Sequence, residues 1–116
     1  MFELEVIASD RVSQELREFL SEEEFDELLR FLLENPLNGK LIKGTGGLRK
    51  LRWKVKKLNR GKRGGIRIIY YLLENVMIIL LKTYSKSDQD DLTEKQKKTI
   101  LLELNKTISK IKTELL

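Results

Sequence analysis

Residues 66–84 contain two apolar runs that limit the possible folds of this chain more than any other segment. Ile66–Leu73 and Val76–Tyr84 are rich in β-branched, aliphatic and aromatic side chains, which is typical of strands. Only Glu74 and Asn75 separate the two runs, and so short a connection predicts a β-hairpin. Because the runs are almost continuously apolar, we expect both faces of this hairpin to be largely covered.

The segment before this hairpin predicts a strand and two amphipathic helices. Phe2–Val6 alternates with period two, which indicates a short strand. Asp10 can cap a first helix, and Ser21 with Glu24 has the spacing of a capping box for a second helix. Both helices carry an apolar stripe, and Asn35–Pro36 ends the second because proline cannot continue a helix.

The remaining segments complete a small α+β domain. Residues 39–47 contain four glycines and predict a loop, and Lys50–Leu58 alternates like a half-buried strand. A basic connection at 59–65 leads into the hairpin, and Thr93–Leu115 predicts a final helix that begins with a second capping box. The order β-α-α-β-β-β-α, without a long linker, predicts a single domain over residues 1–116.

The chain has neither cysteine nor histidine, which restricts its possible chemistry. Disulfides, thiolate metal sites and every mechanism with a histidine base are excluded. Any catalysis must therefore use Lys, Arg, Tyr, Asp or Glu, and we expect no metal and no small-molecule cofactor. Asp88, Asp90 and Asp91 could bind a divalent ion, but their position before a helix favours helix capping.

The sequence also predicts a cytoplasmic protein without a membrane segment. No apolar run approaches the ~18 residues that a membrane-spanning helix needs. The first ten residues carry acidic side chains in place of the basic region of a signal peptide. The absence of cysteine also suits the cytoplasm.

Charge is distributed very unevenly along the chain. Residues 1–34 contain 11 acidic and 3 basic side chains, whereas residues 35–73 contain 12 basic and no acidic ones. Such a segment could be a solvated basic face without a partner. A long stretch without carboxylates is better explained by a polyanionic partner.

The predicted strand after the glycine-rich loop carries the most informative pattern. Its alternation places cations on one face about 7 Å apart, namely Lys50, Arg52, Lys54 and Lys56. Like charges this close favour loss of a proton from one lysine. That lysine could accept the proton of a ribose 2′-hydroxyl while arginines stabilise the charge that develops at phosphorus. An edge strand protected against aggregation by lysines would show a similar pattern.

Two further segments place polar side chains beside strands. Gly61–Arg67 leads a basic, glycine-rich loop into a strand that presents Arg67, and no helix follows as a P-loop would require. Arg67 could instead pair with a carboxylate of the acidic N-terminal helices. Tyr84 could stack on a base or donate a hydrogen bond to phosphate, although an aromatic residue at a strand end is also typical of a core.

These motifs follow one another in a definite order: Gly44–Trp53, Gly61–Tyr71, Tyr84–Lys86 and Asp91–Thr93. The ordered set resembles the RelE/ParE superfamily of bacterial toxins, and is most similar to its HigB-like branch. The resemblance extends over nearly the whole chain. It implies a twisted antiparallel sheet with two helices packed across it. It also implies ribosome-dependent cleavage of mRNA, which stops translation, and neutralisation by a co-encoded antitoxin, expected to be a helix-turn-helix protein.

The resemblance also implies roles for individual residues of an endoribonuclease that needs no metal. Lys50 is the candidate base, Arg52 and Arg67 would hold the scissile phosphate, and Lys86 or Tyr84 would assist the leaving oxygen. The family's C-terminal tyrosine has no counterpart after Tyr84, so Tyr84 is offered as its substitute. The expected contacts to RNA and the ribosome are made by the other cations of the basic segment: Arg49, Lys54, Lys56, Lys57, Arg60, Lys62 and Arg63.

Two other functions remain open from the sequence. One is a ParE-like inhibitor of DNA gyrase, a branch that does not keep this cationic set. The other is a plain RNA-binding module whose basic face does not cleave. The expected partners of the favoured function are the antitoxin, the ribosome and mRNA, with no membrane partner.

Overall fold

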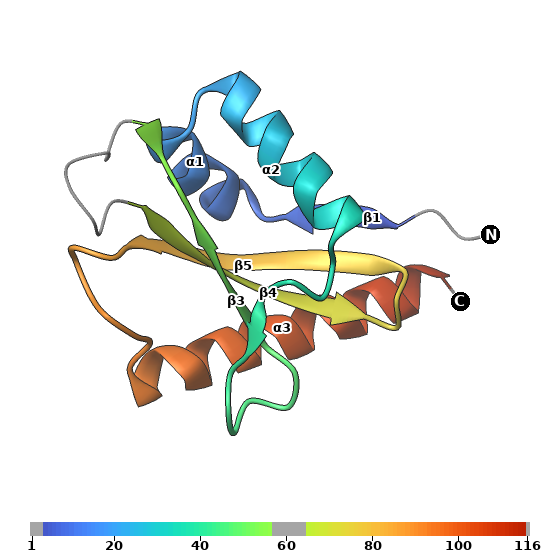
Figure 1. The fold of residues 1–116 in the computed structure, drawn as a ribbon. Helices are drawn as coiled ribbons and strands as arrows, with labels where there is room; N and C mark the ends of the chain where they lie inside the picture. The colour runs from blue at the N-terminus through green and yellow to red at the C-terminus, as the bar shows by residue number, and fades with distance from the viewer. Residues whose placement is uncertain (1–3, 57–64, 116) are drawn as a thin grey trace.

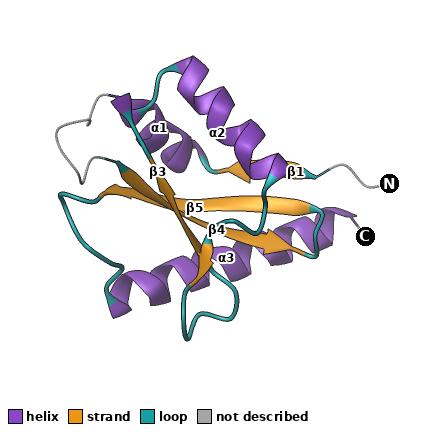
Figure 2. Cartoon of the chain, in the orientation of Figure 1, coloured by secondary structure: helices purple, strands orange, loops and turns teal. Residues whose placement is uncertain are grey.

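The computed structural model describes residues 4–56 and 65–115. A single sheet lies between two helical layers, with α1 and α2 on one face and α3 on the other (Figures 1 and 2). The elements follow the predicted order with one short strand added: β1 (Glu5–Ala8), α1 (Asp10–Phe19), α2 (Glu22–Glu34), β2 (Lys40–Leu41), β3 (Arg49–Trp53), β4 (Ile66–Leu73), β5 (Met77–Ser85) and α3 (Glu94–Leu115).

The five strands lie in the order β1-β5-β4-β3-β2. Neighbouring strands from β5 to β2 are antiparallel, as predicted, but β1 pairs with β5 in parallel, so the sheet is mixed. The strand β2 falls inside the segment that the glycines predicted to be a loop. Its two residues pair with β3 because the loop turns back onto the edge of the sheet.

The predicted hairpin is confirmed and forms the centre of the sheet. Glu74 and Asn75 have φ values of 49° and 59°, and the Val76 amide donates to the Leu73 carbonyl at 2.9 Å. Two central residues with positive φ match the twist of the flanking strands. Along β4, alternate side chains pack against opposite helical layers, which explains the almost continuous apolar run.

The helix starts show how local sequence fixed the ends of the elements. Both predicted capping boxes are present, at Ser21–Glu24 and at Thr93–Gln96. The hydrogen bond with the Ser21 amide lowers the pKa of Glu24. The first cap differs from the prediction, because the Ser9 side chain accepts the Val12 amide at 3.2 Å and Asp10 is already helical.

The strand β3 is shorter than the predicted Lys50–Leu58. Its ladder ends at Trp53, although the alternation of burial continues as far as Val55; Leu58 lies outside the described residues. On the neighbouring strand, Gly65 has φ 134°, and a Cβ atom there would lie 2.7 Å from the Trp53 carbonyl oxygen. Only glycine allows this close approach, so Gly65 permits β4 to start beside the end of β3.

Within the described residues, no helix is both long and apolar enough to cross a bilayer.

Candidate nucleic-acid interface

Three of the predicted catalytic residues lie in one row across the sheet. In the strand register, Arg52 of β3 is opposite Arg67 of β4, and Arg67 is opposite Tyr84 of β5. Directly paired residues point to the same face of a sheet. We call Arg52, Arg67 and Tyr84 the cross-strand row. Lys50 lies two residues from Arg52 and therefore on the same face.

The cross-strand row faces the α3 side of the sheet. Ile69 and Leu73, which share the face of Arg67, pack in the core that includes Ile100 and Leu104 of α3. The acidic helices α1 and α2 cover the opposite face. The alternative in which Arg67 pairs with a carboxylate of these helices is therefore wrong, because the sheet separates the two charges.

Arg67 is a buried cation with few partners. Its side chain is buried, with a relative exposure of 9% for the residue, and its guanidinium donates to the Ile66 carbonyl at a long 3.4 Å. No ion pair of Arg67 occurs among the residues that the structure describes. A guanidinium has five N–H donors, and a buried charge is costly unless it is paired. The geometry is suited to an anion.

Tyr84 adds a second buried polar group that needs a hydrogen-bond partner. The residue is 5% exposed, and its hydroxyl has no hydrogen-bond partner among the described residues. Burial raises the pKa of Tyr84, the charge of Asp91 raises it further, and Arg67 opposes this change. The hydroxyl therefore keeps its proton and can donate it to a bound anion.

The two predicted lysines are each paired with an aspartate of the loop between β5 and α3. The Lys50 ammonium lies 2.6 Å from an Asp91 carboxylate oxygen, and the Lys86 ammonium lies 3.1 Å from Asp90. The hydrogen bond and charge of Lys50 lower the pKa of Asp91, with smaller effects of Lys86 and Lys97. Lys50, the candidate base, is therefore held in an ion pair in this structure.

These ion pairs correct the interpretation of the acidic loop. Thr93 and Gln96 cap α3, whereas Asp90 and Asp91 bind lysines. No group of three acidic side chains gathers into a possible metal site in the part of the chain that is described. Sequence spacing could not reveal the Lys50–Asp91 contact, because 41 positions separate its partners.

The other predicted RNA contacts are dispersed. Arg49 lies on the face opposite the cross-strand row and donates to the carbonyls of Leu37 and Gly39 at 3.1 and 2.8 Å. Lys54 and Lys56 follow the end of β3 and are exposed. Lys57, Arg60, Lys62 and Arg63 lie outside the described residues.

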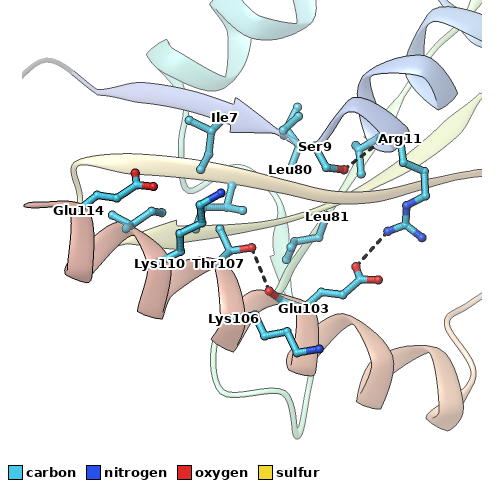
Figure 3. Close-up of a pocket in the computed structure, with 14 residues that line it drawn as sticks. Ile7, Ser9, Arg11, Leu80, Leu81, Glu103, Lys106, Thr107, Lys110 and Glu114 are labelled. Atoms are coloured by element: carbon cyan, nitrogen blue, oxygen red, sulfur yellow. Dashed lines mark hydrogen bonds and ion pairs between the residues drawn. The ribbon is translucent and has the colours of Figure 1, made fainter.

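A separate groove runs between β1, the start of α1 and α3 (Figure 3). It encloses a cavity of about 620 Å³, and Ile7, Leu81 and Ile111 contribute to its mostly apolar lining. Arg11 and Glu103 form an ion pair of 3.0 Å at this groove. None of the predicted catalytic residues lines it, so it is distinct from the cross-strand row.

Comparison with known proteins identifies the fold. No family model matches the chain. Among solved structures, the free state of a double arginine-to-alanine mutant of E. coli toxin RelE is similar with a TM-score of 0.51 and 18% sequence identity. The match covers 78% of this chain and 90% of that chain. The predicted RelE-like α+β fold is thus confirmed.

Proposed function

We propose that this chain is the toxin of a type II toxin–antitoxin system and an endoribonuclease that cleaves mRNA on the ribosome. The observation that carries the proposal is the cross-strand row, where a buried guanidinium and a buried hydroxyl both lack an anionic partner among the described residues. The RelE-like fold and the basic segment 35–73 support it. The sequence motifs favour the HigB-like branch.

In the proposed reaction the RNA supplies its own nucleophile. The ribose 2′-hydroxyl loses its proton and its oxygen bonds to phosphorus, while the bond from phosphorus to the 5′ oxygen breaks and that oxygen takes a proton. Negative charge gathers on the non-bridging oxygens in the transition state. Arg52 and Arg67 stabilise this charge, which is the contribution that preorganised donors make to such reactions.

The remaining groups transfer protons. Tyr84 donates to the phosphate or to the leaving oxygen, because its raised pKa keeps the hydroxyl protonated. Lys50 is the candidate base, and it becomes available for this role only when Asp91 no longer holds its ammonium group. Lys86 assists at the leaving oxygen under the same condition, with Asp90 as its present partner.

The decisive experiment measures mRNA cleavage on translating ribosomes with purified wild-type protein and Arg67→Ala. We expect cleavage by the wild type only when ribosomes are present. Loss of one preorganised donor should lower the single-turnover rate by roughly 10²-fold. Arg67→Lys should also be impaired, since an ammonium cannot form the bidentate contact of a guanidinium.

A matched control is Arg30→Ala, which removes an exposed arginine of α2 on the opposite face of the sheet. This variant should cleave at the wild-type rate. A folded Arg67→Ala protein that cleaves normally would contradict the assignment of Arg67. Arrest of DNA replication with intact mRNA would favour a gyrase inhibitor, and RNA binding without any cleavage would favour a non-catalytic module.

A further inference from the structure

A second basic site adjoins the cross-strand row. A hollow with a cavity volume of about 490 Å³ lies between β2, β3 and the start of α3. Four lysines line it, namely Lys40, Lys43, Lys50 and Lys97. We call it the lysine hollow. Three of these lysines were not among the predicted RNA contacts, and Lys50 links the hollow to the row.

The strand register places two of these cations side by side. Lys40 of β2 is directly opposite Lys50 of β3, so both side chains point to the same face. Like charges in this position destabilise a sheet. Their presence is explained if an anion binds between them, and the same is true of Arg52 opposite Arg67 in the next row.

One carboxylate lines the hollow among the described residues, and it belongs to Asp91. Its oxygen accepts a hydrogen bond from Lys50 at 2.6 Å, while the side chain of Asp91 remains 73% exposed. An exposed ion pair contributes little to stability, so a stronger anion can replace the carboxylate without disrupting the fold. Asp91 therefore marks where an anionic oxygen lies in this site.

We propose that the lysine hollow binds a phosphate of the mRNA next to the scissile phosphate, and that this phosphate displaces Asp91 from Lys50. The inference rests on the proposed function and extends it to a neighbouring position of the substrate. Lysine suits this task because its ammonium group is a point charge that holds phosphate without demanding one orientation.

A binding experiment tests the site separately from cleavage. The probe is a fluorescein-labelled, single-stranded RNA that is 2′-O-methylated throughout, so that it has no nucleophile and cannot be cut. Its affinity is measured by anisotropy at low salt and over a series of salt concentrations. Removing one phosphate contact with Lys40→Ala/Lys43→Ala should weaken binding and reduce the salt slope by about 0.7. Lys106→Ala, an exposed lysine at the separate groove, should leave the slope unchanged.

Asp91→Asn should change the RNA affinity in the opposite direction to Lys40→Ala/Lys43→Ala. The variant removes the competing charge, so the same RNA should bind more tightly than it does to the wild type. Unchanged or weaker binding by folded Asp91→Asn, or an unchanged salt slope in Lys40→Ala/Lys43→Ala, would overturn the proposal. If these binding changes occur and no variant or wild type cleaves RNA, the lysine hollow stands and the proposed catalysis fails.

A neutral methylphosphonate linkage in the message identifies which phosphate is bound. Placed next to the cleavage site, it should weaken binding of mRNA-programmed ribosomes to the wild type but cause no further loss in Lys40→Ala/Lys43→Ala. Equal losses in both proteins would mean that the lysines contact another phosphate, such as one of ribosomal RNA, and would contradict the inference.

Discussion

At the scale of single residues, the candidate site is defined by buried polar groups with few or no partners among the described residues: Arg67 has one long hydrogen bond, and the Tyr84 hydroxyl has none. Strand pairing holds Arg67 between Arg52 and Tyr84, and burial removes both the Arg67 and the Tyr84 side chains from water. Unpaired buried groups of this kind reduce stability. On the proposed function, these groups bind the phosphate of the substrate.

Tyr84→Phe should separate stability from activity. The change removes a buried hydroxyl without a partner, so the free energy of unfolding should stay constant or rise by about 1 kcal/mol. Cleavage should slow because the proton donor is lost. Thermal unfolding and single-turnover cleavage measure the two effects. A Tyr84→Phe protein with normal cleavage would exclude Tyr84 from the reaction, whereas a strong loss of stability would show that its hydroxyl has a structural partner.

Tyr70 predicts how stability responds to alkaline pH. Its hydroxyl donates to the Pro36 carbonyl at 2.8 Å and accepts the Gly39 amide at 2.9 Å. Burial raises the pKa of Tyr70 in the folded protein, so folding favours the neutral phenol. The stabilisation is complete below the unfolded pKa of about 10 and is lost as pH rises through the folded pKa. In Tyr70→Phe, the melting temperature should be lower near neutral pH, and its decline above pH ~10 should be shallower.

At the scale of secondary-structure elements, the sequence predicted features that depend on neighbouring residues and missed features that depend on contacts between distant segments. Period, capping boxes and the Glu74–Asn75 connection gave α2, α3 and the central hairpin, because each signal acts within a few residues. The end of β3 was predicted too late, since alternation continues to Val55 while the ladder depends on how β4 approaches. The parallel pairing of β1 depends on the tertiary arrangement, which no local pattern encodes.

The sequence likewise predicted only part of the candidate site. Sequence predicted Lys50, Arg52, Arg67 and Tyr84 as site residues because their strands alternate and their motifs resemble a family. The roles of Asp90 and Asp91 were missed because the contacts that define them form only when the loop before α3 folds back onto the sheet. Lys40 was missed because the two-residue strand β2 has too few residues to show a period.

Gly65→Ala tests the junction between β3 and β4. An added Cβ atom would lie 2.7 Å from the Trp53 carbonyl oxygen, at a φ of 134° that alanine rarely adopts. We expect a loss of about 1–3 kcal/mol in stability, as for other residues forced into strained backbone. Cleavage should fall further than stability explains, because Arg67 lies two residues away. Gly46→Ala is a useful comparison, since it also has positive φ but an added Cβ atom would meet nothing within 4 Å. Equal effects of the two changes would contradict a specific steric role for Gly65.

At the scale of the whole molecule, the acidic N-terminal helices and the candidate site lie on opposite sides of the sheet. The acidic helices α1 and α2 cover one face, and the cross-strand row and lysine hollow lie toward the other. This arrangement preserves the positive field on the face that would meet RNA. It also leaves that field available to an antitoxin with an acidic segment.

On the proposed function, binding of the antitoxin should therefore depend on ionic strength. We expect the association rate to fall as salt rises, because exposed charges steer the encounter and salt screens them. Stopped-flow mixing of the two purified proteins over a salt series measures this rate. Arg67→Ala should reduce the dependence less than removal of several exposed lysines, because Arg67 is buried. An association rate that does not change with salt would contradict electrostatic steering.

The pairing of β1 with β5 has a consequence for the order in which the protein matures. Glu5–Ala8 joins a strand that begins only at Met77, so the first strand and the two helices after it are synthesised long before the surface they cover. Contacts between such distant segments form slowly and leave apolar faces exposed in the meantime. The cross-strand row is likewise incomplete until Tyr84 has been added and β5 has paired. On the proposed function, a nascent chain would thus leave its own ribosome unharmed through most of its translation.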